Sequence, residues 1–98
     1  MSQATGFPLS IDSTKPAQAP GIVHYQVFEE LVIYHPSSAQ AASLNESARA
    51  IWELCDADRT VEEICVELAE RLGLAPEEVR ADVHSGVVRL CELGLLCR

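Results

Sequence analysis

The chain has 98 residues, 48% of them hydrophobic, which suffices for one modest core and predicts a single domain. Its formal net charge of −8 argues against nucleic acid or an anionic membrane surface as partner, because both attract clustered Lys and Arg. The sequence has neither a secretory signal pattern nor an 18-residue apolar run, so we expect a cytoplasmic protein.

Residues 1–20 mix small polar residues with Pro8, Pro16 and Pro20 and show no sustained period. Such a composition is typical of segments without fixed packing. We therefore expect a flexible N-terminal tail or loosely docked arm over residues 1–20, outside the core. A single domain should then occupy residues 21–98.

Residues 22–28 and 31–35 carry the pattern of two β-strands. In the first run, apolar residues recur at every second position, which is the period of a half-buried strand. These alternating residues are Val23, Tyr25 and Val27. Glu29 and Glu30 separate the two runs, so a hairpin is the simplest connection, although the usual Asn-Gly turn is missing.

Residues 39–44 are small and weak in strand propensity. Pro36 and the two serines after it end the preceding strand. By itself, the pattern of residues 39–44 leaves a loop, an edge strand and a lead-in to the next helix equally open.

Two helices follow, each marked by its capping residues. Asn45 is a favoured N-cap, and the helix after it runs to a turn at residues 56–59. The next helix opens with a capping box between Thr60 and Glu63, and Gly73 ends it. Both helices carry apolar residues at the spacing of one buried face.

A third helix begins at Pro76, a favoured first helical residue, and continues to Gly94. Two or three short strands followed by three helices predict an α+β fold of winged-helix type. We expect a small three-stranded antiparallel sheet followed by a three-helix bundle.

The sequence contains no recognisable catalytic or metal-binding pattern. Its four cysteines lack the Cys-x-x-Cys spacing of a zinc site, and we expect free thiols, of which only Cys97 is exposed. The other three are Cys55, Cys65 and Cys91. The histidines are scattered, and the acidic pairs at 62–63 and 77–78 lie in first helical turns, where they complement the helix dipole. We therefore expect no enzymatic activity, no metal and no cofactor.

The order and spacing of several segments resemble the PqqD family. This family comprises the pyrroloquinoline quinone (PQQ) biosynthesis protein D and its relatives, the recognition elements of ribosomally synthesised and post-translationally modified peptides (RiPPs). The resemblance covers about residues 22–97. It is carried by residues 44–48, 51–56, 59–64, 82–83 and 90–96.

The resemblance implies a non-catalytic peptide chaperone that binds the leader segment of a precursor peptide and delivers it to a modifying enzyme, often a radical S-adenosylmethionine enzyme. In such domains the leader adds as an extra strand to the third strand and lies beside the third helix. An edge strand offers unpaired N–H and C=O groups to such a peptide. The expected peptide-binding residues are Gln40, Ala41, Ala42, Ser43, Val79, Asp82, Val83, Gly86, Val87 and Leu90.

Two positions depart from the family pattern. Ala57 stands where relatives usually carry Gly after the helix, so the turn must avoid positive φ there or accept strain. Gly86 stands where a bulky residue is common, and glycine inside a helix costs about 1 kcal/mol relative to Ala. Gly86 either enlarges the peptide groove or permits a tight contact with a strand or with Trp52. We expect the leader to carry apolar anchors and basic charge, because an acidic leader would be repelled.

Two other classes of function compete with this one. The first is a protein-interaction or homodimerisation module, because strand addition also permits edge-to-edge dimers. A winged-helix DNA-binding regulator is disfavoured, because the third helix offers only Arg80 and Arg89 as cations. Four acidic residues accompany them: Glu77, Glu78, Asp82 and Glu92.

Overall fold

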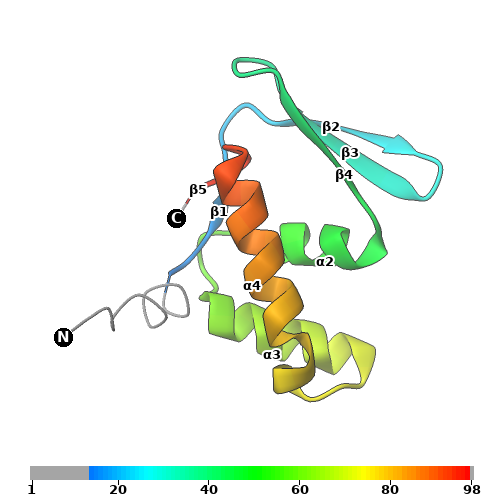
Figure 1. Ribbon diagram of the computed structural model, residues 1–98, viewed down its shortest axis with the longest axis vertical. Helices are drawn as coiled ribbons and strands as arrows, with labels where there is room; N and C mark the ends of the chain where they lie inside the picture. The colour runs from blue at the N-terminus through cyan, green and yellow to red at the C-terminus, as the bar shows by residue number, and fades with distance from the viewer. Residues whose placement is uncertain (1–13, 98) are drawn as a thin grey trace.

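The computed structural model describes residues 14–97, so residues 1–13 of the predicted tail lie outside the described residues. A three-stranded sheet lies at one end of a group of three helices, and a second, two-stranded sheet lies where the two ends of the described chain meet (Figure 1). This α+β arrangement confirms the predicted fold class. The elements are β1 (Ala17–Gln18), β2 (Val23–Val27), β3 (Glu30–His35), β4 (Gln40–Leu44), α2 (Glu46–Leu54), α3 (Val61–Leu72), α4 (Pro76–Glu92) and β5 (Leu96–Cys97).

The larger sheet is antiparallel with the strand order β2-β3-β4. Val27 pairs with Glu30, so the hairpin loop consists of Phe28 and Glu29. The predicted hairpin is confirmed, but its loop lies one residue earlier than the separator expected from sequence. The ambiguous segment before the first helix is the edge strand β4, one of the three alternatives that the sequence left open.

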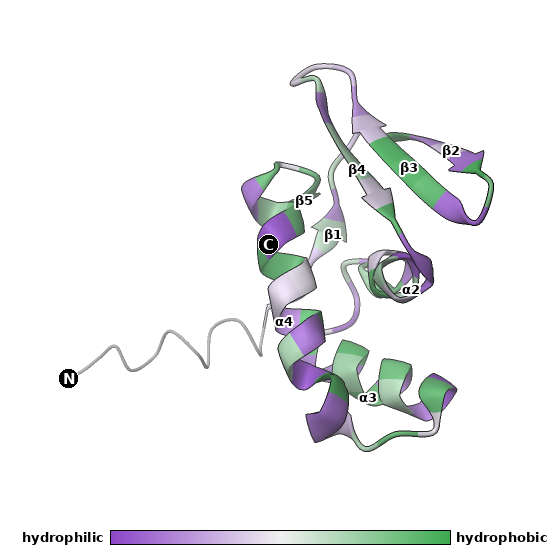
Figure 2. Ribbon diagram, turned by 45° about the vertical axis from the view of Figure 1, so that its right-hand side comes forward, coloured by the Kyte–Doolittle hydropathy of each residue, from purple (hydrophilic) through white to green (hydrophobic). Residues whose placement is uncertain are grey.

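The two faces of this sheet differ in burial. Leu31, Ile33 and Leu44 point toward the helices and are buried, and Figure 2 shows the hydrophobic run along β3. Successive strand residues point to opposite faces, so Val32 and its pairing partner Tyr25 lie on the outer face. All five residues of β2 are exposed. The strand predicted from the alternation in β2 is confirmed, but the prediction that this strand is half-buried was wrong.

The capping residues of α2 and α3 act as the sequence predicts. Asn45 Oδ1 accepts a hydrogen bond of 2.9 Å from the Ala48 N–H. At α3 the Glu63 N–H donates to the Thr60 hydroxyl over 3.1 Å, and the Thr60 N–H donates to the Glu63 carboxylate over 2.8 Å. Gly73 ends α3 in the left-handed region, with φ of 71°. These local interactions fix both helix boundaries.

Helix α4 is the longest element and packs against α3. Its first turn is capped by Glu78, whose carboxylate accepts from the Ala75 N–H over 2.9 Å. Arg80 joins the two helices by donating to both carboxylate oxygens of Glu62, at 3.3 and 2.6 Å. Between the helices and the sheet lies one hydrophobic core, which includes Ile33, Ile51, Trp52, Ile64, Leu68, Val83 and Val87.

Residues 14–20 are the described part of the segment for which the sequence predicts a flexible tail or loosely docked arm, and they pack against the rest of the domain. Pro16 is fully buried and Ala19 nearly so. Ala17 pairs with Cys97 in the two-stranded sheet, and the Ala19 N–H donates to the Leu95 carbonyl over 3.0 Å. Residues 14–20 therefore pack with the domain that the sequence predicted for residues 21–98. A two-residue strand carries no pattern of its own, so this pairing could not be predicted from the sequence.

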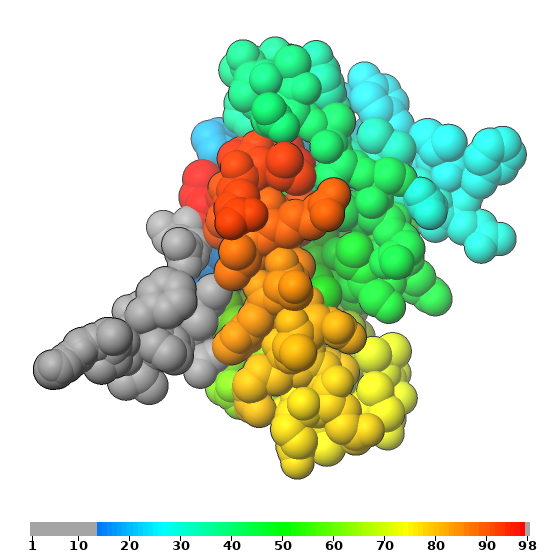
Figure 3. All heavy atoms as spheres, in the orientation of Figure 1, coloured from blue at the N-terminus to red at the C-terminus, as the bar shows by residue number. Residues whose placement is uncertain are grey.

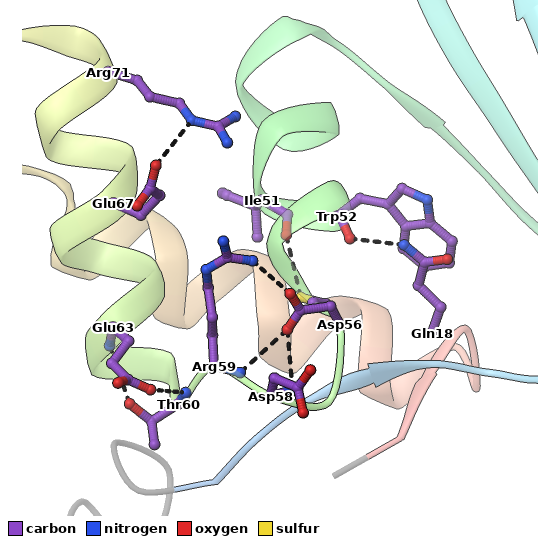
Figure 4. A network of polar contacts seen from close by, with 11 residues as sticks. Gln18, Ile51, Trp52, Asp56, Asp58, Arg59, Thr60, Glu63, Glu67 and Arg71 are labelled. Carbon is purple, nitrogen blue, oxygen red and sulfur yellow. Dashed lines mark hydrogen bonds and ion pairs between the residues drawn. The ribbon is translucent and has the colours of Figure 1, made fainter.

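The turn between α2 and α3 is held by polar contacts (Figure 4). Asp56 Oδ1 accepts from the N–H groups of Asp58 and Arg59, at 3.0 and 3.1 Å. The hydrogen bond from Asp58 is the main reason why the pKa of Asp56 lies below its ordinary value. Ala57 has φ of 72°, so of the two outcomes expected at this position the turn accepts the strain. Its N–H donates to the Pro16 carbonyl over 3.1 Å, which ties the turn to the N-terminal segment.

Candidate functional site

Strand β4 lies at an edge of the sheet. It pairs with β3 on one side, and no other strand within residues 14–97 pairs with its second side. The side chains of Gln40, Ala41 and Ser43 are exposed, and Ala42 is half-buried. A short edge strand with small side chains leaves backbone N–H and C=O groups accessible to an extended chain.

A pocket of about 140 Å³ lies beside this strand, between β4, α2 and α4. Its lining is mostly apolar, and Arg89 is the charged residue among the residues that line it. The strand contributes Ala42, Ser43 and Leu44, α2 contributes Ala48 and Ile51, and α4 contributes Gly86, Arg89 and Leu90. The pocket thus combines an apolar wall with one cation and a neighbouring strand edge.

The structure separates the predicted residues of α4 into three groups. Gly86 and Leu90 line the pocket. Three valines of the predicted set, Val79, Val83 and Val87, are buried in the core instead. Asp82 is exposed and does not line the pocket. Fewer of the predicted residues of α4 therefore line the pocket than the sequence pattern indicated.

On the strand side, Ala42 and Ser43 line the pocket, whereas Gln40 and Ala41, at the start of β4, lie outside it. Ala48 and Ile51 of α2 and Arg89 of α4 also line the pocket and were not predicted from the sequence. Arg89 could have been found by spacing, because it follows Gly86 by three residues and so lies on the same side of the helix. The contribution of α2 depends on tertiary packing that no local pattern reveals.

Gly86 is not required by a close approach of another backbone. A β-carbon at this position would lie 3.5 Å from Cδ1 and 4.0 Å from Cγ2 of Ile51, which are ordinary van der Waals distances. Neither a strand nor Trp52 is the near neighbour that the tight-contact interpretation required. The missing side chain instead leaves room in the pocket, which is the other alternative raised by the sequence.

Other features of the described chain do not add chemistry to this site. Within residues 14–97, no three His, Cys, Asp or Glu side chains are grouped so that they could hold a metal ion. The cysteines are free thiols: Cys55 and Cys65 are buried, Cys91 is half-buried and Cys97 is exposed. In the same part of the chain, no helix has the length and apolar character needed to cross a membrane.

The fold and this site define a class of protein: a small α+β binding domain with an edge strand beside an apolar pocket. The family model described as Coenzyme PQQ synthesis protein D (PqqD) matches residues 30–96, and the chain belongs to this family. The resemblance noted in the sequence is thereby confirmed. No curated protein sequence matches the chain.

Three solved structures share the fold. The chain is 18% identical to a lasso peptide synthetase B1 complexed with the leader peptide, with a TM-score of 0.72 and coverage of 86% of this chain and 99% of that one. The chain is 20% identical to TbiB1 in complex with the TbiA(beta) leader peptide, with a TM-score of 0.70 and coverage of 82% of this chain and 93% of that one.

The third structure is the PqqD truncation of Methylobacterium extorquens PqqCD, described as a functional and stand-alone RiPP recognition element. It is 22% identical to this chain, with a TM-score of 0.69 and coverage of 85% of this chain and 88% of that one. At these identities the likeness establishes a shared fold.

Proposed function

We propose that this protein binds the leader segment of a RiPP precursor peptide and delivers it to a modifying enzyme, without catalysing a reaction itself. The single observation that carries the proposal is the free edge of β4 beside the pocket that Gly86 lines. Membership of the PqqD family supports it, as do two relatives of the same fold that are described in complex with leader peptides.

In the proposed mode, the leader pairs as an extra strand with β4. Main-chain hydrogen bonds would supply affinity, and alternate side chains of the leader would point toward the pocket. The residues Ala42, Leu44, Ile51 and Leu90 favour an apolar leader side chain there. Arg89 at the same pocket favours a carboxylate or carbonyl oxygen nearby, whereas the net charge of −8 favours a leader that is basic elsewhere.

Delivery requires a second protein that modifies the peptide. A radical S-adenosylmethionine enzyme is the candidate that the family resemblance favours, within PQQ or a related RiPP pathway. In this proposal the domain raises the local concentration of the precursor at the enzyme, because the domain binds the precursor and the enzyme at the same time. No side chain of the domain needs to touch the reacting atoms.

Backbone amide NMR tests the proposal. The isotope-labelled protein is titrated with synthetic leader segments of precursor peptides that are encoded near the gene of this chain. We expect shifts concentrated in β4 and around Gly86 to Leu90. Gly86→Phe should weaken leader binding by at least about tenfold, because the new ring would fill the pocket. Ser85→Phe adds the same ring on the exposed side of α4 and should leave affinity unchanged.

Two results would count against leader binding. Unchanged affinity in a folded Gly86→Phe variant would exclude the pocket as the binding site. Absence of binding by every candidate leader, together with a mass that rises with concentration, would favour the dimerisation module instead. That alternative has its own support, since both β2 and β4 are sheet edges in the described chain.

A further inference from the structure

Phe28, in the loop of the β2–β3 hairpin, combines an exposed aromatic side chain with a left-handed backbone conformation. Phe28 is 96% exposed and has φ of 55°. A two-residue hairpin loop with positive φ at its first position normally takes Gly there, because a β-carbon makes this conformation unfavourable. Phe28 therefore costs conformational energy and buries no apolar surface within the described chain.

The apolar surface continues from this loop onto the outer face of the sheet. Tyr25 and Val27 of β2 are 56% and 45% exposed, and Val23 is 37% exposed. Beside them lies a hollow of about 420 Å³, lined by Val27, Phe28, Glu29, Glu30, Val32 and Ser43. We call Val23, Tyr25, Phe28 and this hollow the hairpin surface. Figure 3 shows that the hairpin projects from the body of the molecule, so a large partner can reach its tip.

Acidic residues border the hairpin surface. Glu29 and Glu30 also line a second, larger hollow of about 810 Å³ on the other side of the loop, next to α2. Glu46 and Glu53 contribute to the same hollow. Its one cation, Arg49, is engaged by Glu53 over 3.0 Å and by Gln26 over 2.6 Å. An apolar centre with an acidic border fits a partner that has an apolar socket bordered by Lys and Arg.

The same charges make a second copy of this chain a poor occupant. A two-fold contact through the hairpin surface would bring Glu29 and Glu30 of one copy near the same residues of the other. Each copy also carries a net charge of −8, so long-range repulsion opposes their approach. Charge complementarity thus favours a different protein with a basic surface.

The hairpin surface adjoins the proposed leader site. Ser43 lines both the 420 Å³ hollow and the pocket at α4. A peptide strand added to β4 would therefore run along the border of the hairpin surface. A protein bound there would stand next to the peptide without covering the pocket.

We propose that the hairpin surface is the docking face for the modifying enzyme, with Phe28 as its anchor and Glu29 and Glu30 as its charge-pairing border. The inference rests on the proposed function for the identity of the partner. The surface features themselves are independent of it. An exposed aromatic residue surrounded by apolar neighbours is the kind of residue that contributes most to protein interfaces.

The variant Phe28→Gly should change enzyme affinity and stability in opposite directions, so it distinguishes a docking role of Phe28 from a structural one. Glycine removes the aromatic ring and also relieves the positive-φ strain, so the variant should unfold at higher denaturant concentration than the parent protein. Its affinity for the purified modifying enzyme encoded beside this chain, measured by calorimetry, should nevertheless fall by at least about tenfold. Leu72→Ser, which removes an exposed apolar side chain at the end of α3, should leave that affinity unchanged.

A second variant tests the border. Glu29→Lys should weaken enzyme binding and reduce its dependence on salt, because an attractive charge pair is replaced by repulsion. Leader affinity should stay unchanged in Phe28→Gly, which changes no charge. Failure of the parent protein to bind any leader would count against the proposed function, while the comparison of enzyme affinities would still decide the role of the hairpin surface.

Three outcomes would overturn the docking proposal. The first is equal enzyme affinity in the parent protein and Phe28→Gly. The second is no binding between the enzyme and the parent protein. The third is self-association of the parent protein, seen by analytical ultracentrifugation and abolished by Phe28→Gly, which would assign the hairpin surface to a second copy.

Discussion

Ile51 on α2 faces Gly86 on α4 across the pocket, with its Cδ1 atom 3.5 Å from the place of a β-carbon at residue 86. A methyl group therefore fits without displacement of Ile51. Alanine also favours the helix by about 1 kcal/mol over glycine. We expect Gly86→Ala to raise the free energy of unfolding by about 0.5–1 kcal/mol, measured by urea denaturation. A loss of stability would show that Ile51 cannot accommodate the methyl group.

Ala57 occupies the left-handed region in the turn after α2, with φ of 72°. Glycine adopts this conformation without the steric cost of a β-carbon, so Ala57→Gly should stabilise the protein by about 1 kcal/mol. Ala39, with φ of 61°, should respond in the same direction. Ala81→Gly on the exposed side of α4 should instead lower stability by about 1 kcal/mol. Equal losses in all three variants would show that the turns are not strained.

Ala19 is 7% exposed and lies within the segment that pairs with the C-terminal strand. Ala19→Asp would bury a carboxylate where the protein now buries a methyl group, and we expect a loss of about 2–4 kcal/mol in the free energy of unfolding. Pro20→Ser changes the next, exposed residue and should alter stability by less than about 0.5 kcal/mol. Chemical denaturation of both variants measures the difference. Equal stability would mean that residues 16–20 are dispensable for the fold.

Burial raises the pKa of the Cys55 thiol from 9.0 to about 12, with smaller contributions from Cys91 and Asp56. Below pH 9 the thiol is protonated in both the folded and the unfolded chain. Between pH 9 and 12 the unfolded chain releases this proton while the folded chain retains it, so the free energy of unfolding falls as pH rises.

The test compares denaturation at about pH 8 and about pH 10 in the parent protein, Cys55→Ala and Cys97→Ser. Cys55→Ala should lose stability at both pH values because it leaves a small cavity, but its further loss at high pH should be smaller than that of the parent protein. Cys97 is exposed, so Cys97→Ser should retain the full pH dependence. The same dependence in all three proteins would mean that Cys55 ionises freely in the folded state.

The helices were predictable because their signals are local. The side chain of Asn45, the capping box of Thr60 and the left-handed Gly73 each act within a few residues of the boundary that they set. The hairpin of β2 and β3 followed from the alternating residues of β2 and the break after it, whereas β4 was one of three alternatives that the sequence left open. Pro76 at the start of α4 completed a pattern that required no knowledge of tertiary contacts.

The remainder depends on contacts between residues that are distant in sequence. Ala17 pairs with Cys97 through two-residue strands, for which neither propensity nor periodicity gives a signal. The alternation of β2 identified a strand but could not tell that Tyr25 faces solvent, because a period of two fixes two faces and not which of them is covered. Likewise, valines of α4 assigned to the groove lie in the core, since the helix buries a wide stripe and the pocket lies at its border.

The pairing of β1 with β5 also gives the fold an almost ring-shaped chain path. Because Ala17 lies opposite Cys97, a linker from Cys97 to Thr14 could join the two ends of the described chain and leave the buried Pro16 in place. New ends could then be opened in the turn at residues 36–39, and such a circular permutant would begin with β4. Under the proposed function, a precursor peptide fused to that new end would be tethered next to the strand edge that binds it, so that one polypeptide would contain both partners.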